Sequence, residues 1–220
     1  MTVQLDFMAV LRDWPMLVTG VVWTLGLTAV AVVLGLLVAV FCAWARANGP
    51  KWLAFVVGAY VELIRNTPFI VQLFFVFFGL PAAGVRLSPV TASLMALTLN
   101  LAAYGTEIIR AGLEATPRGQ IEAGLSLAMS RVQIFTHVIL PPALKKVWPA
   151  LVSQIIIVML GSAVCGQIAT RELSYAANVI SASTFRTFES YIVATAIYLG
   201  LAWAVRRVLN WVGPRFIFGR

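Results

Sequence analysis

The chain has 220 residues, of which 61% are hydrophobic and 11% are charged. A soluble domain usually has about 25% charged and about 45–50% apolar residues, so this composition excludes an ordinary soluble fold and predicts a membrane protein. The 16 Lys and Arg against 8 Asp and Glu give a net charge of +8, which in a polytopic membrane protein sets orientation rather than indicating a nucleic-acid partner.

Five segments without charged residues predict an all-α, polytopic fold with five transmembrane helices in one domain over residues 1–220. The segments cover residues 14–45, 66–85, 87–106, 147–170 and 190–205. The second follows an apolar stretch holding only Glu62, so its helix is expected to begin near Val61, with Arg65 snorkelling to one interface. The fifth is short, and snorkelling of Arg206 and Arg207 lengthens it.

The basic residues predict the orientation of these spans. Alternate loops place twelve of the sixteen basic residues on one side and four on the other, namely Arg12, Arg86, Arg171 and Arg186. By the positive-inside rule the side with twelve is cytoplasmic. The N-terminus is therefore expected outside and the C-terminus in the cytoplasm.

The groupings of residues needed for catalysis or metal binding are missing from the sequence. Cys42 and Cys165 lie in apolar runs, and His137 is the only histidine, so no metal-ligand set is predicted. The carboxylates are few and spread over different loops, and the chain has no glycine-rich phosphate-binding loop. We expect no catalytic residues, no metal and no cofactor in this chain.

The connection over residues 107–146 is neither a span nor a disordered tail. Thr116-Pro117 predicts a helix start, with Ile121, Leu125 and Met129 forming one stripe. Ser130-Arg131-Val132-Gln133 reads as a capping box, so a second short helix is expected to start there and end before Pro141-Pro142. Residues 116–141 thus form either a helix pair resting on lipid or a docking element for a cytosolic protein.

Five blocks in order resemble the polar amino acid uptake group of binding-protein-dependent ABC importer permeases. They read GVVWTLGLTAVAVVLG (20–35), ELIRNTPFIVQLFFVFFGLP (62–81), LNLAAYGTEIIRAGLEATPRGQ (99–120), VILPPALKKVWPAL (138–151) and FESYIVATAIYL (188–199). Within residues 116–141, the run GQIEAGLSLA (119–128) is similar to the EAA loop of that family, which contains its coupling helix.

The resemblance implies a type I ABC importer permease in a prokaryotic cytoplasmic (inner) membrane. Its partners would be a cytosolic ABC ATPase dimer that binds ATP and Mg, a second permease chain, identical or homologous, and an extracytoplasmic solute-binding protein that delivers a polar amino acid. The residues that would dock the ATPase are Gly119, Gln120, Glu122, Ala123, Gly124, Leu127 and Ala128.

The sequence departs from the family pattern at two places. Where the EAA motif usually has Ala and, four residues later, Gly, this chain has Gly124 and Ala128, and an exchange between small residues is expected to keep the helix thin. The mid-membrane Lys-Asp-Thr triplet common in the family is here Leu160-Gly161-Ser162, without charge.

Polar residues inside spans are expensive unless they face a cavity or a partner helix, so they are candidates for a translocation pathway. These candidates are Gln72, Asn100, Tyr104, Gln154, Gly161 and Ser162. The alternative for each is a hydrogen bond between helices without substrate contact. Glu107 with Arg110 and Glu114, and Glu62 with Arg65, have the spacing of structural ion pairs.

Two other classes of function remain as alternatives. An ion-gradient-driven secondary transporter or channel subunit predicts charges or broken helices at mid-membrane, of which only Pro68 is visible. A membrane enzyme with Glu107 or Glu122 as general base lacks supporting acid–base partners.

Overall fold

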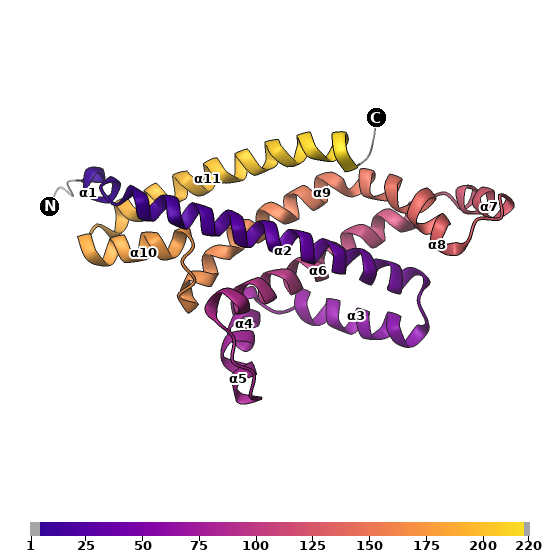
Figure 1. Ribbon diagram of the computed structural model, residues 1–220, viewed down its shortest axis with the longest axis horizontal. Helices are drawn as coiled ribbons and strands as arrows, with labels where there is room; N and C mark the ends of the chain where they lie inside the picture. Colours follow the sequence, from indigo (N-terminus) through magenta and orange to yellow (C-terminus); the bar gives the residue numbers. More distant parts are fainter. Residues whose placement is uncertain (1–4, 218–220) are drawn as a thin grey trace.

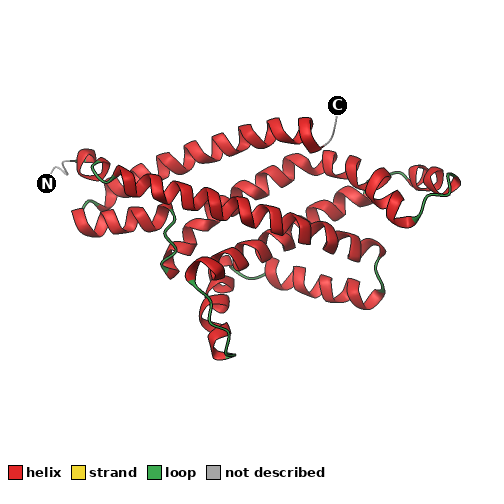
Figure 2. Cartoon of the chain, in the orientation of Figure 1, coloured by secondary structure: helices red, strands yellow, loops and turns green. Residues whose placement is uncertain are grey.

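The computed structural model describes residues 5–217, and all regular elements in this part of the chain are helices (Figures 1 and 2). The α-helices are α1 (Phe7–Leu11), α2 (Trp14–Asn48), α3 (Lys51–Arg65), α4 (Phe69–Phe74), α5 (Leu80–Ala82), α6 (Pro89–Glu114), α7 (Arg118–Ser126), α8 (Arg131–Gln133), α9 (Leu140–Gly161), α10 (Leu173–Thr184) and α11 (Thr187–Val212). Wider π turns cover Phe75–Gly79, Ile134–Ile139 and Gly213–Ile217, and a 3₁₀ helix covers Ser162–Ile168.

The structure confirms the predicted all-α fold. Within the described residues, four helical segments are long and apolar enough to cross a membrane: Trp14–Asn48, Pro89–Glu114, Arg131–Ile168 and Thr187–Arg215. The fifth span is the pair Lys51–Arg65 and Phe69–Ala82, which is bent by 110°. With this pair counted as one, there are five spans, and they run along the long axis of the molecule except for α4 and α5, which project from its side (Figure 1).

The expectation of one helix beginning near Val61 is wrong. The chain instead forms α3 from Lys51 and breaks at Asn66–Pro68, because proline lacks the N–H that a continuing helix needs. The break leaves the last carbonyls of α3 without backbone N–H donors, and side chains donate hydrogen bonds to them instead. Asn66 Nδ2 donates to Glu62 O (2.8 Å), and Thr67 Oγ1 donates to Leu63 O (2.9 Å).

The expectation of a short helix ending before Pro141-Pro142 is also wrong. The predicted capping box is present, since Ser130 Oγ accepts from Gln133 N (3.3 Å) and Gln133 Oε1 accepts from Ser130 N (2.8 Å). However, helical structure continues to Ile168. The π turn Ile134–Ile139 changes the hydrogen-bond register just before the prolines, so they fall in the first turn of α9, where no N–H donor is required.

The centre of the fold is the packing of α2 against α6. Small residues allow close approach: a Cβ added at Gly35 would lie 3.0 Å from Leu101 Cδ2, and one added at Gly105 would lie 3.0 Å from Ala39 Cβ. Close packing through small residues is the usual basis of helix association in membranes, where no hydrophobic force joins helices. These two helices form the scaffold on which α3 and α9 pack.

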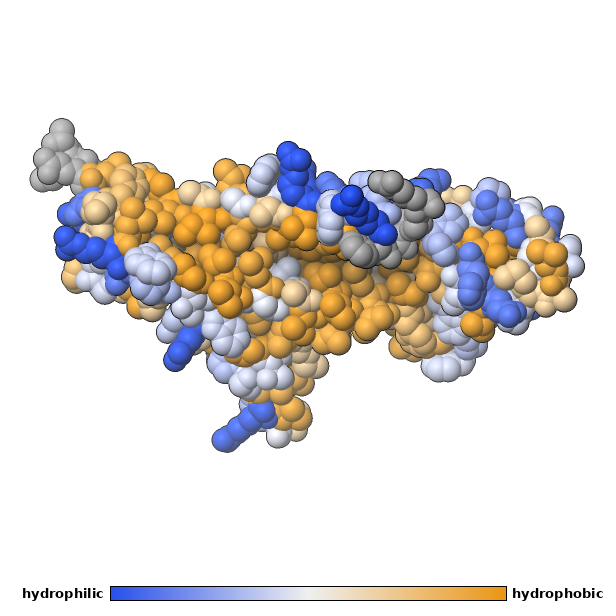
Figure 3. Space-filling model, turned by 45° about the horizontal axis from the view of Figure 1, so that its top comes forward, coloured by the Kyte–Doolittle hydropathy of each residue, from blue (hydrophilic) through white to orange (hydrophobic). Residues whose placement is uncertain are grey.

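Helix α10 was not expected from the sequence. Its 12 residues are too few to cross a bilayer, and it packs along the first half of α2. A Cβ added at Gly20 would lie 2.8 Å from Leu173 Cα, and Leu173 N donates to Thr24 Oγ1 (3.2 Å) in the buried interface. Figure 3 shows that much of the molecular face drawn is apolar, with hydrophilic residues at both ends of the long axis, on the upper edge and on the part that projects downward.

Candidate functional site

Helix α7 lies at one end of the long axis, beyond the ends of the spans (Figure 1). It begins directly after Pro117, as the Thr116-Pro117 signal predicts. The buried residue of this helix is Gly124: an added Cβ would lie 3.0 Å from Ile134 Cγ1 and 3.7 Å from Met129 Sδ. Gly124 therefore lets α7 lie close against the π turn that begins the fourth span.

The end of α7 is a Schellman turn. Ala128 N donates to Leu125 O (2.9 Å), and Met129 N donates to Gly124 O (3.1 Å), with Ala128 in the left-handed region at φ 54°. Met129 and Ala128 thus lie beyond the helix, and the expected stripe ends at Leu125. Ala128 therefore does not affect the thickness of the helix. Its position requires a positive φ, which glycine adopts more readily than alanine.

The other predicted docking residues form the outer surface of the α7 turn. They are Gly119, Gln120, Glu122, Ala123, Leu127 and Ala128, and all are exposed. One of them is a large apolar side chain, Leu127, which is 77% exposed, and Leu125 beside these residues is 56% exposed. Exposed apolar side chains beside a carboxylate, outside any span, make a surface suited to a partner protein.

Gln72 and Asn100, two of the pathway candidates, bond to each other across the break in the second span. Gln72 Nε2 donates to Ile64 O (2.7 Å) and Thr67 O (3.0 Å), while Gln72 Oε1 accepts from Asn100 Nδ2 (3.0 Å). Gln72 therefore caps the end of α3 and links the segment at the break to α6 through its hydrogen bond with Asn100. In this structure both side chains make the hydrogen bonds between helices that the sequence left as the alternative.

Tyr104 lies one turn further along α6, against Arg65. Its hydroxyl donates to Arg65 O (3.4 Å), so another carbonyl at the end of α3 has a hydrogen-bond partner. The centroid of its ring lies 5.5 Å from Arg65 Cζ. The ring and the guanidinium form a cation–π contact that holds the Arg65 side chain over α6.

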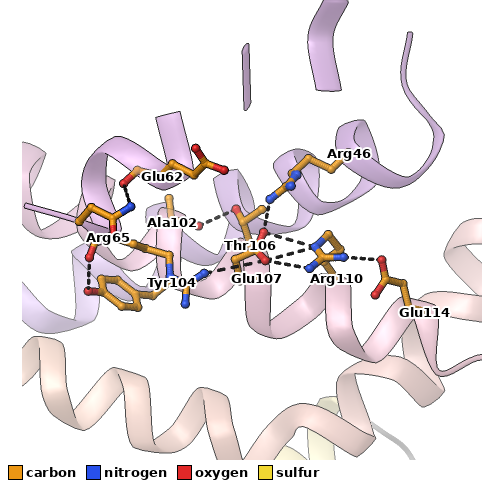
Figure 4. Close-up of polar contacts among 10 residues, drawn as sticks. Arg46, Glu62, Arg65, Ala102, Tyr104, Thr106, Glu107, Arg110 and Glu114 are labelled. Atoms are coloured by element: carbon orange, nitrogen blue, oxygen red, sulfur yellow. Dashed lines mark hydrogen bonds and ion pairs between the residues drawn. The ribbon is translucent and has the colours of Figure 1, made fainter. Parts of the chain in front are cut away.

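Figure 4 shows Glu107 of α6 at the centre of a group of charges that we call the Glu107 cluster: Glu107, Glu114, Arg46, Arg65 and Arg110. Glu107 pairs with Arg46 of α2 and, at 2.9 Å, with Arg110, and it lies 3.8 Å from Arg65 of α3. Arg110 also pairs with Glu114. The predicted pairing within α6 is confirmed, and the cluster additionally joins three helices.

The expected pair between Glu62 and Arg65 is wrong. Among the described residues, no ion pair joins them, and Figure 4 shows the Glu62 carboxylate directed away from the Arg65 guanidinium. Arg65 turns toward Glu107 and Tyr104 because both offer it a favourable electrostatic contact. Glu62 is left exposed at the end of α3.

The three candidates on the fourth span differ in environment. Gln154 is buried, and Ser162 is fully buried with its hydroxyl donating to Met159 O (2.6 Å). Gly161 is half-buried, and a Cβ there would meet nothing within 4 Å. The structure therefore does not bring Gln154, Gly161 and Ser162 into one polar group with Gln72, Asn100 and Tyr104.

Sequence reasoning missed Glu172, a fully buried carboxyl between the fourth span and α10. It caps α10 by accepting from Ser174 N (2.8 Å) and Tyr175 N (2.7 Å), and Tyr198 of α11 donates to it at 2.6 Å. Burial raises the pKa of the Glu172 carboxyl, against these hydrogen bonds, which favour its charged form. The signal was an acidic residue directly before an apolar run, a helix N-cap pattern.

A helical bundle with a broken second span and an exposed short helix beyond its end defines a multi-pass membrane protein. The profile of the family "Binding-protein-dependent transport system inner membrane component" matches residues 31–218. The chain belongs to this family. Its members are translocation subunits of ABC importers in the inner membrane, and the ATPase is a separate partner.

Curated relatives and solved structures agree with this assignment. The chain is 36% identical over 186 residues to the L-cystine transport system permease protein TcyB of Bacillus subtilis, covering 84% of this chain and 80% of that protein. It is 34% identical over 199 residues to the glutamine transport system permease protein GlnP of Escherichia coli, covering 89% and 90%. A crystal structure of an amino acid ABC transporter with histidines has 36% identity and a TM-score of 0.85, covering 96% and 98%.

A more distant structure supports the fold alone. An inward-facing methionine ABC transporter, MetNI, is 23% identical with a TM-score of 0.68, covering 91% of this chain and 98% of that one. The family match, the curated relatives and the structure at 36% identity favour the importer permease over the ion-driven transporter or channel.

Proposed function

We propose that this chain carries a polar amino acid across the membrane, driven by a cytosolic ABC ATPase dimer that docks on the α7 turn. The substrate would be delivered by an extracytoplasmic solute-binding protein, and a second permease chain, identical or homologous, would complete the pathway. The relatives named above support the substrate class, since their names specify cystine and glutamine.

The observation that carries the docking proposal is the α7 turn itself. It exposes Leu127 and Leu125 with Glu122 beside them, and Gly124 seats the helix directly on the start of the fourth span. A rigid connection of this kind would pass a displacement of α7 to the span, because packed helices move as units. Within residues 116–141, the coupling element would comprise α7 and its Schellman turn.

The orientation follows from the same proposal. The end of α11 points toward the same end of the molecule as α7, while α1 lies at the opposite end (Figure 1). With α7 in the cytoplasm, the C-terminus is cytoplasmic and the N-terminus outside, as the basic residues predict.

The proposal is tested by co-purification in detergent with a co-expressed ABC ATPase. Leu127→Ser removes an apolar side chain that is 77% exposed in the α7 turn, and we expect it to abolish co-elution of the ATPase. The matched control is Phe185→Ser, which removes a 90% exposed aromatic side chain from the turn between α10 and α11 at the opposite end. Equal retention of the ATPase by both variants would exclude α7 as the docking element.

Coupling is tested separately from docking. Glu122→Ala and bulk inserted at Gly124 are expected to leave the spans inserted while ATP hydrolysis continues without uptake. Variants that transport normally with an intact ATPase would remove the α7 turn from the mechanism.

A further inference from the structure

We propose that the end of α11 binds the phosphate groups of anionic phospholipids in the cytoplasmic leaflet of the membrane. The site is a row of four residues spaced four apart, Trp203, Arg207, Trp211 and Arg215, which we call the Trp–Arg row. The inference goes beyond the proposed function and takes from it only the orientation of the chain.

The structure stacks each arginine of the row on the tryptophan four positions before it, since residues at this spacing are neighbours on one face of a helix. Arg207 Cζ lies 5.2 Å from the centroid of the Trp203 ring, and Arg215 Cζ lies 4.9 Å from that of the Trp211 ring. Attraction to a ring face holds a guanidinium in place without consuming the paired N–H donors that bind a phosphate. The row therefore presents two positioned anion-binding groups.

No carboxylate neutralises the arginines at this end of α11. Residues 190–220 contain four arginines and neither Asp nor Glu. Within residues 5–217, Arg206, Arg207 and Arg215 are exposed and take part in none of the ion pairs. In the Glu107 cluster, by contrast, every arginine lies near a carboxylate. The end of α11 is therefore a positive surface that lacks an anion.

The length of α11 places these arginines at the level of the lipid phosphates. Arg207 is 18 residues after Glu189, or about 27 Å along the helix axis, and Arg215 is about 12 Å further. With Glu189 at the outer boundary of a hydrocarbon layer of about 30 Å, Arg207 reaches the inner boundary and Arg215 reaches the headgroup layer beyond it. Tryptophan is also favoured at this boundary.

The row continues an exposed apolar face of the same helix, which favours a lipid over a soluble anion. Leu199, four residues before Trp203, is 73% exposed, and Trp203 and Trp211 are 63% and 53% exposed. One phospholipid can therefore lie with its acyl chain along Leu199 and its phosphate at Arg207. Since the surface offers cations only, a headgroup with a net negative charge fits it better than a zwitterionic one.

The first test measures binding of radiolabelled dioleoyl phosphatidylglycerol to the immobilised chain, with its co-eluting ATPase, in dodecyl maltoside. Arg207→Gln combined with Arg215→Gln is expected to raise Kd about 25-fold, because each basic residue near an anionic surface contributes about fivefold in affinity. The matched control, Arg12→Gln combined with Arg86→Gln, removes two exposed arginines from other turns and should leave Kd unchanged. Equal weakening by the two double variants would overturn the proposal.

The second test separates a built site from positive charge alone. Trp203→Leu combined with Trp211→Leu keeps both charges and the apolar character, and we expect it to raise Kd about fivefold, because the guanidinium groups lose the rings that position them. Arg207→Lys combined with Arg215→Lys should recover only part of the affinity lost in the glutamine variant, because an ammonium lacks the paired donors. Unchanged affinity in the leucine variant would overturn the proposed role of the row.

The third test identifies the source of the phosphate. Unlabelled dioleoyl phosphatidylglycerol should displace the label, whereas dioleoyl phosphatidylcholine and a large excess of inorganic phosphate should not. Displacement by either of the last two would overturn the proposal. Loss of the ATPase, or separation of the permease chains, in the glutamine variant would also overturn it, since the row would then bind protein. A complex that binds phosphatidylglycerol as expected but shows no ATP-dependent uptake would instead contradict the proposed function.

Discussion

Replacing Glu107 with Gln should destabilise the fold far more than replacing Glu114, although both carboxylates pair with Arg110. Glu107 also pairs with Arg46 and lies near Arg65, so the change leaves three guanidinium groups facing one another across α2, α3 and α6. The Glu107 side chain is 18% exposed, whereas that of Glu114 is 62% exposed.

The magnitude follows from these exposures. Breaking a fully buried ion pair costs about 3–5 kcal/mol, and an exposed pair contributes about 0–1 kcal/mol. Because the arginines are partly solvated, we expect Glu107→Gln to lower the free energy of unfolding by about 2–3 kcal/mol, and Glu114→Gln by less than about 1 kcal/mol.

The assay is equilibrium unfolding in mixed detergent micelles, followed by circular dichroism. A second change, Arg46→Gln in the Glu107→Gln background, should recover part of the loss, because it removes one of the uncompensated cations. Equal losses for Glu107→Gln and Glu114→Gln would refute the reasoning that Glu107 links the three helices.

Three further predictions concern packing, the α7 turn and orientation. Gly20→Ala should cost about 1–3 kcal/mol in the same assay, since its Cβ would meet the Leu173 backbone, whereas Gly26→Ala, with open space around it, should be neutral or slightly stabilising; equal effects would contradict the close packing of α10 on α2. Ala128→Gly should stabilise the turn by about 0.5–1 kcal/mol by relieving the positive φ, measured by hydrogen exchange of the last turn of α7, and faster exchange would contradict the assigned strain. A reporter fused after Arg220 should be cytoplasmic, and an external signal would contradict the loop assignment.

The sequence predicted the number and type of spans because hydrophobic length and the absence of charge are properties of each segment alone. It indicated a break at Pro68 and a helix start at Pro117, but it wrongly expected Pro141-Pro142 to end a short helix. Pro68 ends a helix, because Gln72 and Tyr104 provide hydrogen bonds for the carbonyls that the break exposes. Pro141 and Pro142 interrupt nothing, because a π turn precedes them. Both outcomes depend on hydrogen bonds that residue spacing does not reveal.

The candidate site was predicted only in part, because local signals position some of its residues and contacts between distant segments position the others. The α7 turn was visible as local signals at Pro117 and Ser130, and the structure confirms both. The start of α3 at Lys51 was missed, because an apolar stretch holding one Glu was not counted as part of the span. The cap at Glu172 depends on contacts with α11, which lies far along the chain.

The most direct test of the account is uptake by proteoliposomes that contain this chain with its co-eluting ABC ATPase and a binding protein. The account predicts that radiolabelled L-glutamine, L-arginine or L-cystine accumulates only when ATP is present on the side of the membrane that carries the ATPase. It also predicts that Leu127→Ser abolishes this accumulation while Phe185→Ser does not. Accumulation driven by an ion gradient without ATP, by this chain alone, would contradict it.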